Sequence, residues 1–205
     1  MRRTRTRTTL AAVTLAVGLL GSGVSSAHGT THDVDFHDLG RVHVVSQKEL
    51  TEGRGFQQQM AQFVVERMFA AYGTPTSVRR ALQRTRDYLR DRTAFGKPLL
   101  ANQYLQFKLA ELSAKADMLE SHNYACADAF MAGEDTTRYA TVSKLMAGRL
   151  VREVADTCLQ FYGGMGYMEE TWVSRFFRDS RLLSIGGGAD EVMLQVLAKL
   201  DGFDA

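Results

Sequence analysis

Apolar side chains recur at helical spacing through most of this 205-residue chain, from Glu52 onward. In the middle of the chain the apolar positions repeat every seven residues, with others between them, as on one face of a long helix. These positions are Leu105, Leu112, Leu119 and Cys126, interleaved with Leu109, Ala116 and Phe130. A second such face consists of Val142, Met146, Leu150, Val154 and Cys158. The two stripes predict the apolar seam of an antiparallel bundle.

Glycine, proline and capping residues predict where the helices begin and end. The ranges so predicted are about 57–71, 76–92, 169–183 and 190–200, with a loop at 94–101 and the two striped helices between. Asp135 or Thr136 is the expected N-cap of the second striped helix, which stops at Gly163. Only two prolines interrupt the chain. We therefore expect an all-α fold, an up-and-down four-helix-type bundle of four or five helices.

The first 50 residues follow another pattern. Residues 1–27 combine a basic start, a short apolar run and a small-residue cleavage site, which is typical of a secretory signal peptide. That run is too short to span a membrane. Residues 28–50 read as a linker or as the remnant of a β domain, since polar and apolar residues alternate in two short stretches. The predicted domains are thus a signal-like leader (1–27), this linker (28–50) and a helical domain (51–205).

Charge gives no support for a nucleic-acid partner. The net charge is +2, but four arginines and no acidic residue lie in residues 1–27. Without them 21 basic residues face 23 acidic ones, a net charge of −2. Cys126 and Cys158 lack zinc-ligand spacing and are expected to be buried thiols. The helical region has no Glu-x-x-His pair for a di-iron centre, so metal catalysis is not expected.

Three segments at joints between the predicted helices carry glycine, arginine and amide side chains. They are Arg92 with Phe95 and Gly96, then residues 160–164, then residues 187–191. Each alone is ordinary, because Gly-Gly commonly caps a helix and a glycine run commonly forms a turn. An arginine after several others is also commonly solvated. Together, and in this order, they indicate a binding site.

These segments resemble the C-terminal helical domain of the acyl-CoA dehydrogenases. The resemblance rests on RTAFGKPL from Arg92 with Gln103, on QFYGGMGY from Gln160, and on RDSR and IGGGADE at residues 178–191. It covers about residues 51–205 and implies an FAD site. The implied cofactor contacts are Arg92, Phe95, Gln103, Gln160, Phe161, Tyr162, Gly163, Gly164, Ala189, Asp190 and Glu191, with residues 160–164 touching the flavin nucleotide of a neighbouring subunit. The family usually has threonine at position 189, so one hydroxyl contact is absent here.

The resemblance also indicates the catalytic base. Many members of the family carry the base at the position of Gly187, and glycine cannot take a proton. A branch similar to isovaleryl-CoA dehydrogenase carries it on the first helix of this domain, where Glu66 matches. At helical spacing Glu66 has Phe63 and Phe69 as neighbours, and such surroundings would raise the pKa of a carboxyl group. The alternative is a solvent-facing glutamate beside Arg67.

Arg67, Gly187 and Gly188 are implied at the substrate end, and an exposed charge is the alternative for Arg67. The resemblance further implies an acyl-CoA substrate, an electron-transfer flavoprotein as partner and a homodimer or homotetramer. It also implies an N-terminal helical domain and a middle β domain, of which residues 33–56 could be a trace. We expect the chain to act in the cytoplasm, with export as the alternative given the leader. A non-catalytic helical bundle or interaction module without flavin activity is the rival function.

Overall fold

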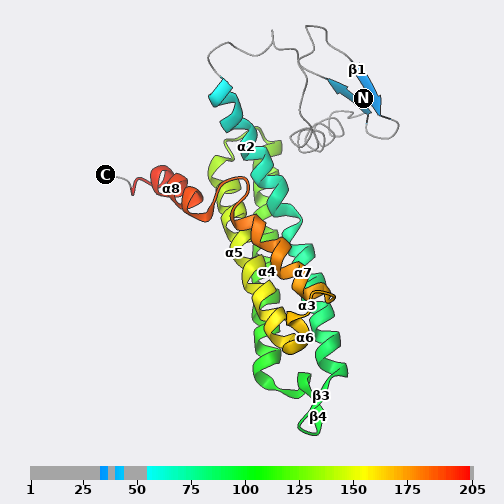
Figure 1. Cartoon of the computed structure of the whole chain (residues 1–205). Coiled ribbons are helices and arrows are strands. Elements are labelled where there is room, and N and C mark those ends of the chain that lie inside the picture. The colour runs from blue at the N-terminus through cyan, green and yellow to red at the C-terminus, as the bar shows by residue number, and fades with distance from the viewer. Residues whose placement is uncertain (1–32, 37–39, 44–54, 204–205) are drawn as a thin grey trace, which may run out of the picture. The chain divides into compact units, whose positions relative to one another are not determined.

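The computed structural model describes residues 33–36, 40–43 and 55–203 (Figure 1). The chain divides into two compact units, residues 1–66 and 67–205. In the first, β1 (Asp33–Phe36) pairs antiparallel with β2 (Gly40–His43), so that Asp33 lies opposite His43. The alternation in this stretch therefore does produce strands. The predicted leader lies outside the described residues.

The second unit is the predicted all-α bundle (Figure 1). Helix α2 (Gly55–Tyr72) leads into it. The elements that follow are α3 (Thr74–Asp91), β3 (Thr93–Ala94), β4 (Lys97–Pro98), the 3₁₀ turn η2 (Leu99–Ala101), α4 (Gln103–Met131), α5 (Thr137–Tyr162), α6 (Gly164–Tyr167), α7 (Trp172–Ser180), the 3₁₀ turn η3 (Arg181–Ser184) and α8 (Asp190–Leu200). None of the described helices is both long and apolar enough to cross a membrane.

Local side-chain bonds explain several of the helix boundaries. Helix α5 starts after Thr136, but the capping oxygen belongs to Asp135, whose Oδ1 accepts from the backbone N of Thr137 at 2.9 Å. Of the two predicted candidates, Thr136 therefore occupies the N-cap position, and Asp135 supplies the capping oxygen. Helix α7 is shorter than predicted because Thr171 caps it, with Oγ1 accepting from the N of Ser174 at 3.4 Å. Its predicted last turn is the 3₁₀ turn η3, a tighter form that is common at helix ends.

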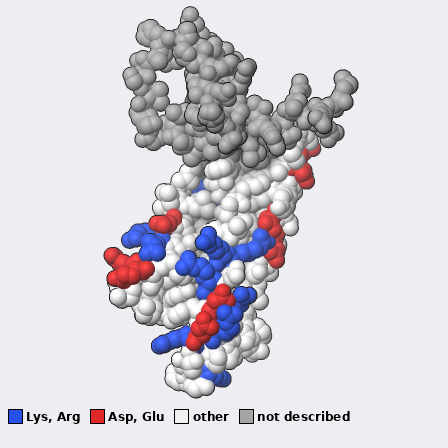
Figure 2. Space-filling view, turned by 90° about the vertical axis from the view of Figure 1, so that its right-hand side faces the viewer, with Lys and Arg blue, Asp and Glu red and all other residues white. Residues whose placement is uncertain are grey.

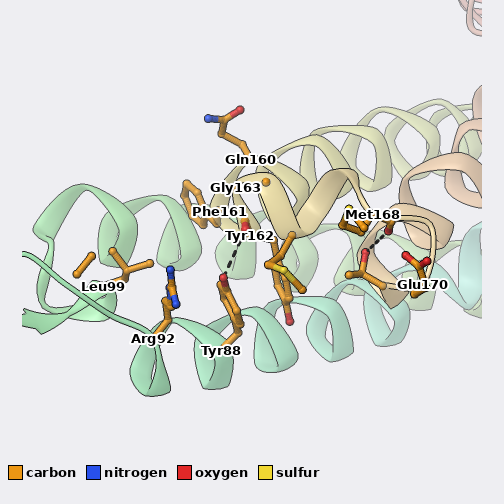
Figure 3. Close-up of a pocket in the computed structure, with 13 residues that line it drawn as sticks. Tyr88, Arg92, Leu99, Gln160, Phe161, Tyr162, Gly163, Met168 and Glu170 are labelled. Carbon is orange, nitrogen blue, oxygen red and sulfur yellow. Dashed lines mark hydrogen bonds between the residues drawn. The ribbon is translucent and has the colours of Figure 1, made fainter.

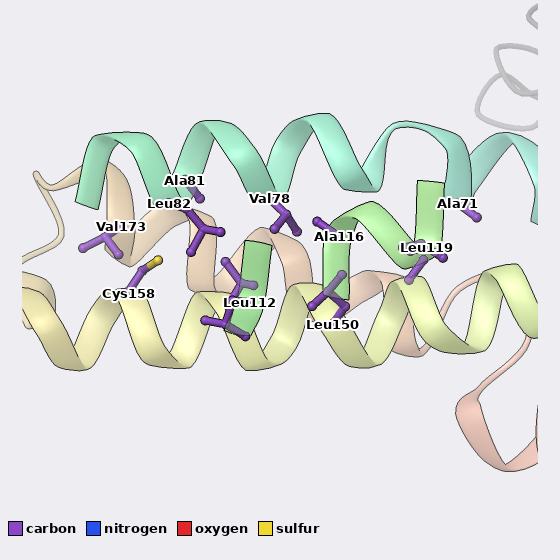
Figure 4. Close-up of a cluster of buried hydrophobic side chains, with 12 residues drawn as sticks. Ala71, Val78, Ala81, Leu82, Leu112, Ala116, Leu119, Leu150, Cys158 and Val173 are labelled. Carbon is purple, nitrogen blue, oxygen red and sulfur yellow. The ribbon is translucent and has the colours of Figure 1, made fainter. Parts of the chain in front are cut away.

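Helix α5 lies at the centre of the bundle and packs against α3, α4, α7, α8 and η3. The apolar core is drawn in Figure 4: Val78, Ala81 and Leu82 from α3, Leu112, Ala116 and Leu119 from α4, Leu150 and Cys158 from α5, and Val173 from α7. Burying one such leucine contributes about 1.5–3 kcal/mol. Cys126 and Cys158 are buried free thiols, as predicted.

The two predicted apolar stripes are wrong at one position each. Met146 is 47% exposed and Phe130 is 37% exposed. The pattern assumes one partner for each helix, whereas α5 is covered on several sides and buries Ala147 and Gly148 instead. Gly148 lies against η3, where an added Cβ would meet Ser184 Oγ at 2.8 Å. Close packing of η3 therefore moves the buried face of α5 away from Met146.

Some of the charged side chains on the bundle surface form ion pairs. On the face drawn in Figure 2, basic side chains have acidic ones beside them. Arg79 binds Asp117 and Glu120 at 2.6 and 2.7 Å, and Arg138 binds Asp201 at 2.8 Å. Exposed pairs of this kind contribute little to stability, because water and salt screen them.

Candidate cofactor and substrate site

A cavity of about 670 Å³ opens at the end of the bundle that carries the β3–β4 hairpin (Figure 3). Its walls come from the C-terminal turns of α3, the hairpin, η2, the C-terminal turn of α5 and the segment leading to α7. The lining residues are Tyr88, Arg92, Ala94, Leu99, Gln160, Phe161, Tyr162, Gly163, Gly164, Met165, Met168, Glu170 and Thr171. Arg92 and residues 160–164, far apart in sequence, thus share one cavity.

One wall of the cavity is a packed aromatic cluster. The rings of Tyr88 and Tyr162 stack with centroids 4.0 Å apart, and Tyr88 Oη donates to the Tyr162 carbonyl at 3.4 Å (Figure 3). Trp172 Nε1 donates to Tyr162 Oη at 2.9 Å, and the Arg84 guanidinium lies 4.2 Å from the centre of the Trp172 ring. Burial raises the pKa of Tyr162, so this phenol stays protonated at neutral pH. The stacked tyrosines thus give the cavity a wall of uncharged aromatic rings.

The glycines at the end of α5 have different physical roles. Gly163 has a φ of +58°, a backbone conformation that residues with a side chain rarely adopt. A Cβ added to Gly163 or Gly164 would meet no heavy atom within 4 Å. Both glycines leave open space beside the backbone. Gly166 is the opposite case, since an added Cβ would lie 2.4 Å from the Leu159 carbonyl oxygen. Gly163 and Gly164 thus keep the cavity accessible, whereas Gly166 permits a turn of the chain.

Five of the residues expected at the cofactor do not line this cavity: Phe95 and Gln103 near the hairpin, and Ala189, Asp190 and Glu191 at the start of α8. Phe95 sits at the tip of the β3–β4 hairpin, with φ +53 and a fully exposed side chain. A bulky residue in that conformation is strained. Gln103 is exposed in the first turn of α4. Both side chains face outward from the described part of the domain.

The remaining candidates of the second unit gather at the start of α8. Arg67 is only 8% exposed, and its Nε donates to the Gly187 carbonyl at 3.4 Å, so the alternative of an exposed charge is wrong. Ala189 is the N-cap of α8 and makes no side-chain capping bond. Asp190 is buried and lies 3.4 Å from Arg152 Nη1, whereas Glu191 is exposed.

Glu66 is half-buried in the first unit, and its Oε1 accepts a hydrogen bond from Nε2 of the exposed Gln62 at 3.1 Å. Gln62 lies one helical turn before Glu66, so the donor to this oxygen is a neutral amide.

Lys144 was missed by sequence reasoning. It is fully buried on α5, and its Nζ donates to the Gly188 carbonyl. One signal was available, because Ala140, Thr141, Ala147 and Gly148 surround it at helical spacing and none of them can pair with a cation. Arg92 and Lys144 also mark two distinct places: from Lys144 to Gln160 along α5 is about 24 Å at the helical rise. In the described residues no three His, Cys, Asp or Glu side chains gather to hold a metal.

Fold and site together define an all-α bundle domain with an arginine- and glycine-lined cavity at one end and buried charges near the other. Residues 53–200 match the family model "Acyl-CoA dehydrogenase, C-terminal domain". The chain belongs to the acyl-CoA dehydrogenase family, whose C-terminal domain it contains.

Curated relatives and solved structures agree. The Escherichia coli K12 protein named "Probable acyl-CoA dehydrogenase YdiO" is 36% identical over 148 residues, which are 72% of this chain and 39% of that protein. The long-chain specific acyl-CoA dehydrogenase of Sus scrofa mitochondria is 31% identical over 72% of this chain and 34% of its own length. The butyryl-CoA dehydrogenase structure from Megasphaera elsdenii superposes with a TM-score of 0.70 at 31% identity, covering 73% of this chain and 39% of that one. The chain thus spans less than half the length of these relatives.

Proposed function

We propose that this chain is the cofactor- and substrate-lining helical part of an FAD-dependent acyl-CoA dehydrogenase. One observation carries the proposal: Arg92 and residues 160–164 line the same cavity. The family resemblance assigns both segments to FAD, and their meeting in space is independent of that resemblance. The activity belongs to oxidoreductases that act on CH–CH groups, with an acyl-CoA thioester as substrate.

The cavity suits the nucleotide end of FAD. Arg92 is exposed at its edge and offers guanidinium donors for a diphosphate. Gly163 and Gly164 leave open space, so a ligand can approach the backbone closely. The stacked tyrosine pair gives a flat apolar wall. Gln160 and Phe161 complete that side of the cavity. Phe95 and Gln103, exposed beyond it, are proposed to contact the same cofactor from the hairpin and the start of α4.

The start of α8 is proposed as the substrate end. Bound FAD supplies the acceptor for a hydride from the β-carbon. As that hydride leaves, Glu66 would take the α-proton, so that the electron pair of the broken C–H bond forms the α,β double bond. Glu66 is assigned this role because Gly187 occupies the position that holds the base in other members. Arg67 and Gly188 shape the loop beside the thioester, while Ala189, Asp190 and Glu191 form the helix start that faces the cofactor. A helix N-terminus offers unpaired N–H groups to anionic or carbonyl oxygens.

The separation of about 24 Å along α5 supports an assembly of more than one copy. We infer that the cavity serves the FAD of a neighbouring copy, while the loop at residues 187–189 serves the copy's own substrate. A homodimer or homotetramer built through these helices satisfies both. An electron-transfer flavoprotein is the proposed electron acceptor, in keeping with the family.

A fusion protein tests the function. The N-terminal and middle domains of the Escherichia coli relative, joined to residues 51–205 of this chain, should bind FAD, and acyl-CoA should bleach its flavin absorbance. A panel of straight and branched acyl-CoAs identifies the preferred chain. The intact relative is the positive control. A fusion that binds FAD and is bleached by none of these thioesters would support the rival function, a non-catalytic helical module.

We further propose that the protein acts in the cytoplasm, where acyl-CoA thioesters are made and consumed. Expression of the full chain in a bacterial host, followed by N-terminal sequencing of the cytosolic and exported fractions, tests this. An intact N-terminus in the cytosol is expected. A mature chain that begins near His28 in the exported fraction would instead establish the leader as a working signal peptide.

A further inference from the structure

Lys144 is a fully buried cation in a bundle core. Removing an ammonium group from water is costly unless it is bonded and balanced. Its Nζ donates to the carbonyl oxygen of Gly188, in the loop between η3 and α8. Burial lowers the pKa of Lys144, the Asp190 carboxylate opposes that shift, and the Arg67 guanidinium adds to it. The free-energy cost of burying Lys144 indicates a role that needs a charged hydrogen-bond donor, which an apolar side chain cannot supply.

Arg67 makes the matching contact on the preceding residue. It comes from α2, is almost fully buried, and its Nε donates to the Gly187 carbonyl at 3.4 Å. Cations from two helices therefore hold two consecutive carbonyl groups of one loop. Both glycines have positive φ, +67 for Gly187 and +112 for Gly188. Glycine residues can adopt many backbone conformations, and the two hydrogen bonds stabilise this one.

Asp190 places a buried carboxylate beside the loop. The Oδ2 of Asp190 lies 3.4 Å from Arg152 Nη1 and 4.0 Å from Arg149 Nε. Its Oδ1 is buried and has no hydrogen-bond partner among the described residues. The Asp190 carboxylate thus compensates charges on α5 and at the same time begins α8, which fixes the far end of the loop.

We propose that Lys144 is a positioning residue, which with Arg67 orients the peptide groups of the Gly187–Ala189 loop toward the ligand. In a planar trans peptide the N–H points away from the carbonyl oxygen of the preceding residue. Two carbonyls held inward turn the N–H groups of Gly188 and Ala189 to the opposite side. Within residues 55–203 neither N–H has an acceptor. The loop is thereby left as a pair of preoriented donors.

Hydrogen exchange on the full chain tests this without any cofactor. Peptides covering 182–194 report on the loop, including the amides of Ile185 and Gly186, which bond to the Leu182 carbonyl, and peptides covering 112–126 report on the core. Lys144→Met should speed loop exchange about tenfold or more, since a buried bond from a charged donor is lost. Core exchange should not change, because an apolar side chain of similar volume replaces the cation. Lys199→Met, an exposed lysine on α8, is the matched control.

Loop exchange at the parental rate in Lys144→Met would overturn the proposal, and so would equal acceleration in loop and core. If that variant does not fold, Arg67→Met should produce the same local acceleration, and its failure to do so is equally decisive. Lys144→Gln, which keeps an N–H donor, should restore part of the protection.

A second measurement rests on the proposed function. In the fusion protein Lys144→Met should raise KM for acyl-CoA more than it lowers kcat, since the loop is misplaced and Glu66 is intact. An equal loss in both with normal loop exchange contradicts the positioning role. Complete inactivity of the parental fusion would overturn the proposed function alone, because the exchange result does not depend on turnover.

Discussion

The two ends of helix α5 are built in opposite ways. Near its C-terminus, the cavity residues Arg92, Gln160, Gly163 and Gly164 are exposed and leave open space beside the backbone. Near its N-terminus, Lys144 and Arg67 are buried and bonded to carbonyls of their own chain. At the first end, no partner is seen for the Arg92 guanidinium among the described residues. At the second end, the buried cations hold a loop of the same chain.

This difference indicates how each end responds to mutation. Exposed side chains make few contacts within the domain, so their mutation should weaken ligand binding and have little effect on the free energy of unfolding. Buried, bonded groups affect loop geometry first and ligand through it. The cavity end is therefore the place to test cofactor binding, and the loop end is the place to test preorganisation.

The largest expected effect is the loss of FAD retention by the chain alone. The cavity offers one end of a nucleotide site, and the costs of association remain while many contacts are missing. After incubation with excess FAD and desalting, the purified chain should show helical circular dichroism, little flavin absorbance and no dye reduction with acyl-CoA. If the purified chain retained one FAD per chain and reduced the dye with acyl-CoA, the cavity would be a complete cofactor site. The proposed difference between the two ends of α5 would then be wrong.

Next in size is the loss of the base. In the fusion protein Glu66→Gln should lower acyl-CoA-dependent flavin bleaching by about a hundredfold to ten-thousandfold, the usual contribution of a general base. FAD absorbance should persist, because no cofactor contact is assigned to Glu66. Addition of Gly187→Glu should recover part of the rate, since the family uses both positions for the same α-carbon. Bleaching of Glu66→Gln at the parental rate would show that the base lies elsewhere.

Arg92 should matter for cofactor and little for folding. Arg92→Met in the fusion should weaken FAD binding about tenfold to a hundredfold, the worth of hydrogen bonds to a charged group. Arg90→Met is the control, because Arg90 is exposed on the same helix and pairs with Asp87 at 3.4 Å. Fluorescence titration measures both dissociation constants. Equal weakening by the two variants would mean general electrostatics rather than a site.

Substitution of Gly166 and of Gly164 should have different effects on the free energy of unfolding, because only Gly166 is closely packed. Gly166→Ala should lower the free energy of unfolding by about 1–3 kcal/mol, because its Cβ would lie 2.4 Å from a backbone oxygen of Leu159. Gly164→Ala should change stability by less than about 0.5 kcal/mol, since the space around it is open. Urea denaturation of the isolated chain measures both. Similar losses in the two variants would contradict the open cavity.

The smallest expected effect is on stability and concerns the ion pairs of Glu153, between the two ends of α5. Glu153 accepts from Lys108 at 2.8 Å and Lys115 at 2.9 Å. Burial alone would raise the pKa of Glu153, but these bonds outweigh it and the pKa is lowered. A lowered pKa means stability that is present above the ordinary value of 4.5 and is lost as pH falls through the lowered one. Glu153→Gln should cost about 0.2–1 kcal/mol at pH 7 and nothing in acid. A constant cost across that range would assign the effect to packing.

Local patterns in the sequence predicted the long helices and six of the twelve residues of the core cluster, but not the short helix α6. The stripes predicted α4 and α5, and the last helix begins and ends where the glycine run and the apolar spacing put it, at Asp190 and Leu200. Such features depend on neighbours three or four residues apart, which the sequence contains directly. The family segments likewise indicated the FAD candidates, since short motifs survive in order along a chain.

Only the tertiary structure decided which distant residues meet. It put Arg92 beside residues 160–164 and left Phe95 and Gln103 outside that cavity. It also showed that Arg67 is buried, which excludes the alternative of an exposed charge. It also buried Lys144 and exposed Met146, although both lie on one helix. The physical reason is that burial depends on every element packed around a helix, and no spacing within α5 encodes the arrangement of its six neighbours, α3, α4, α6, α7, α8 and η3.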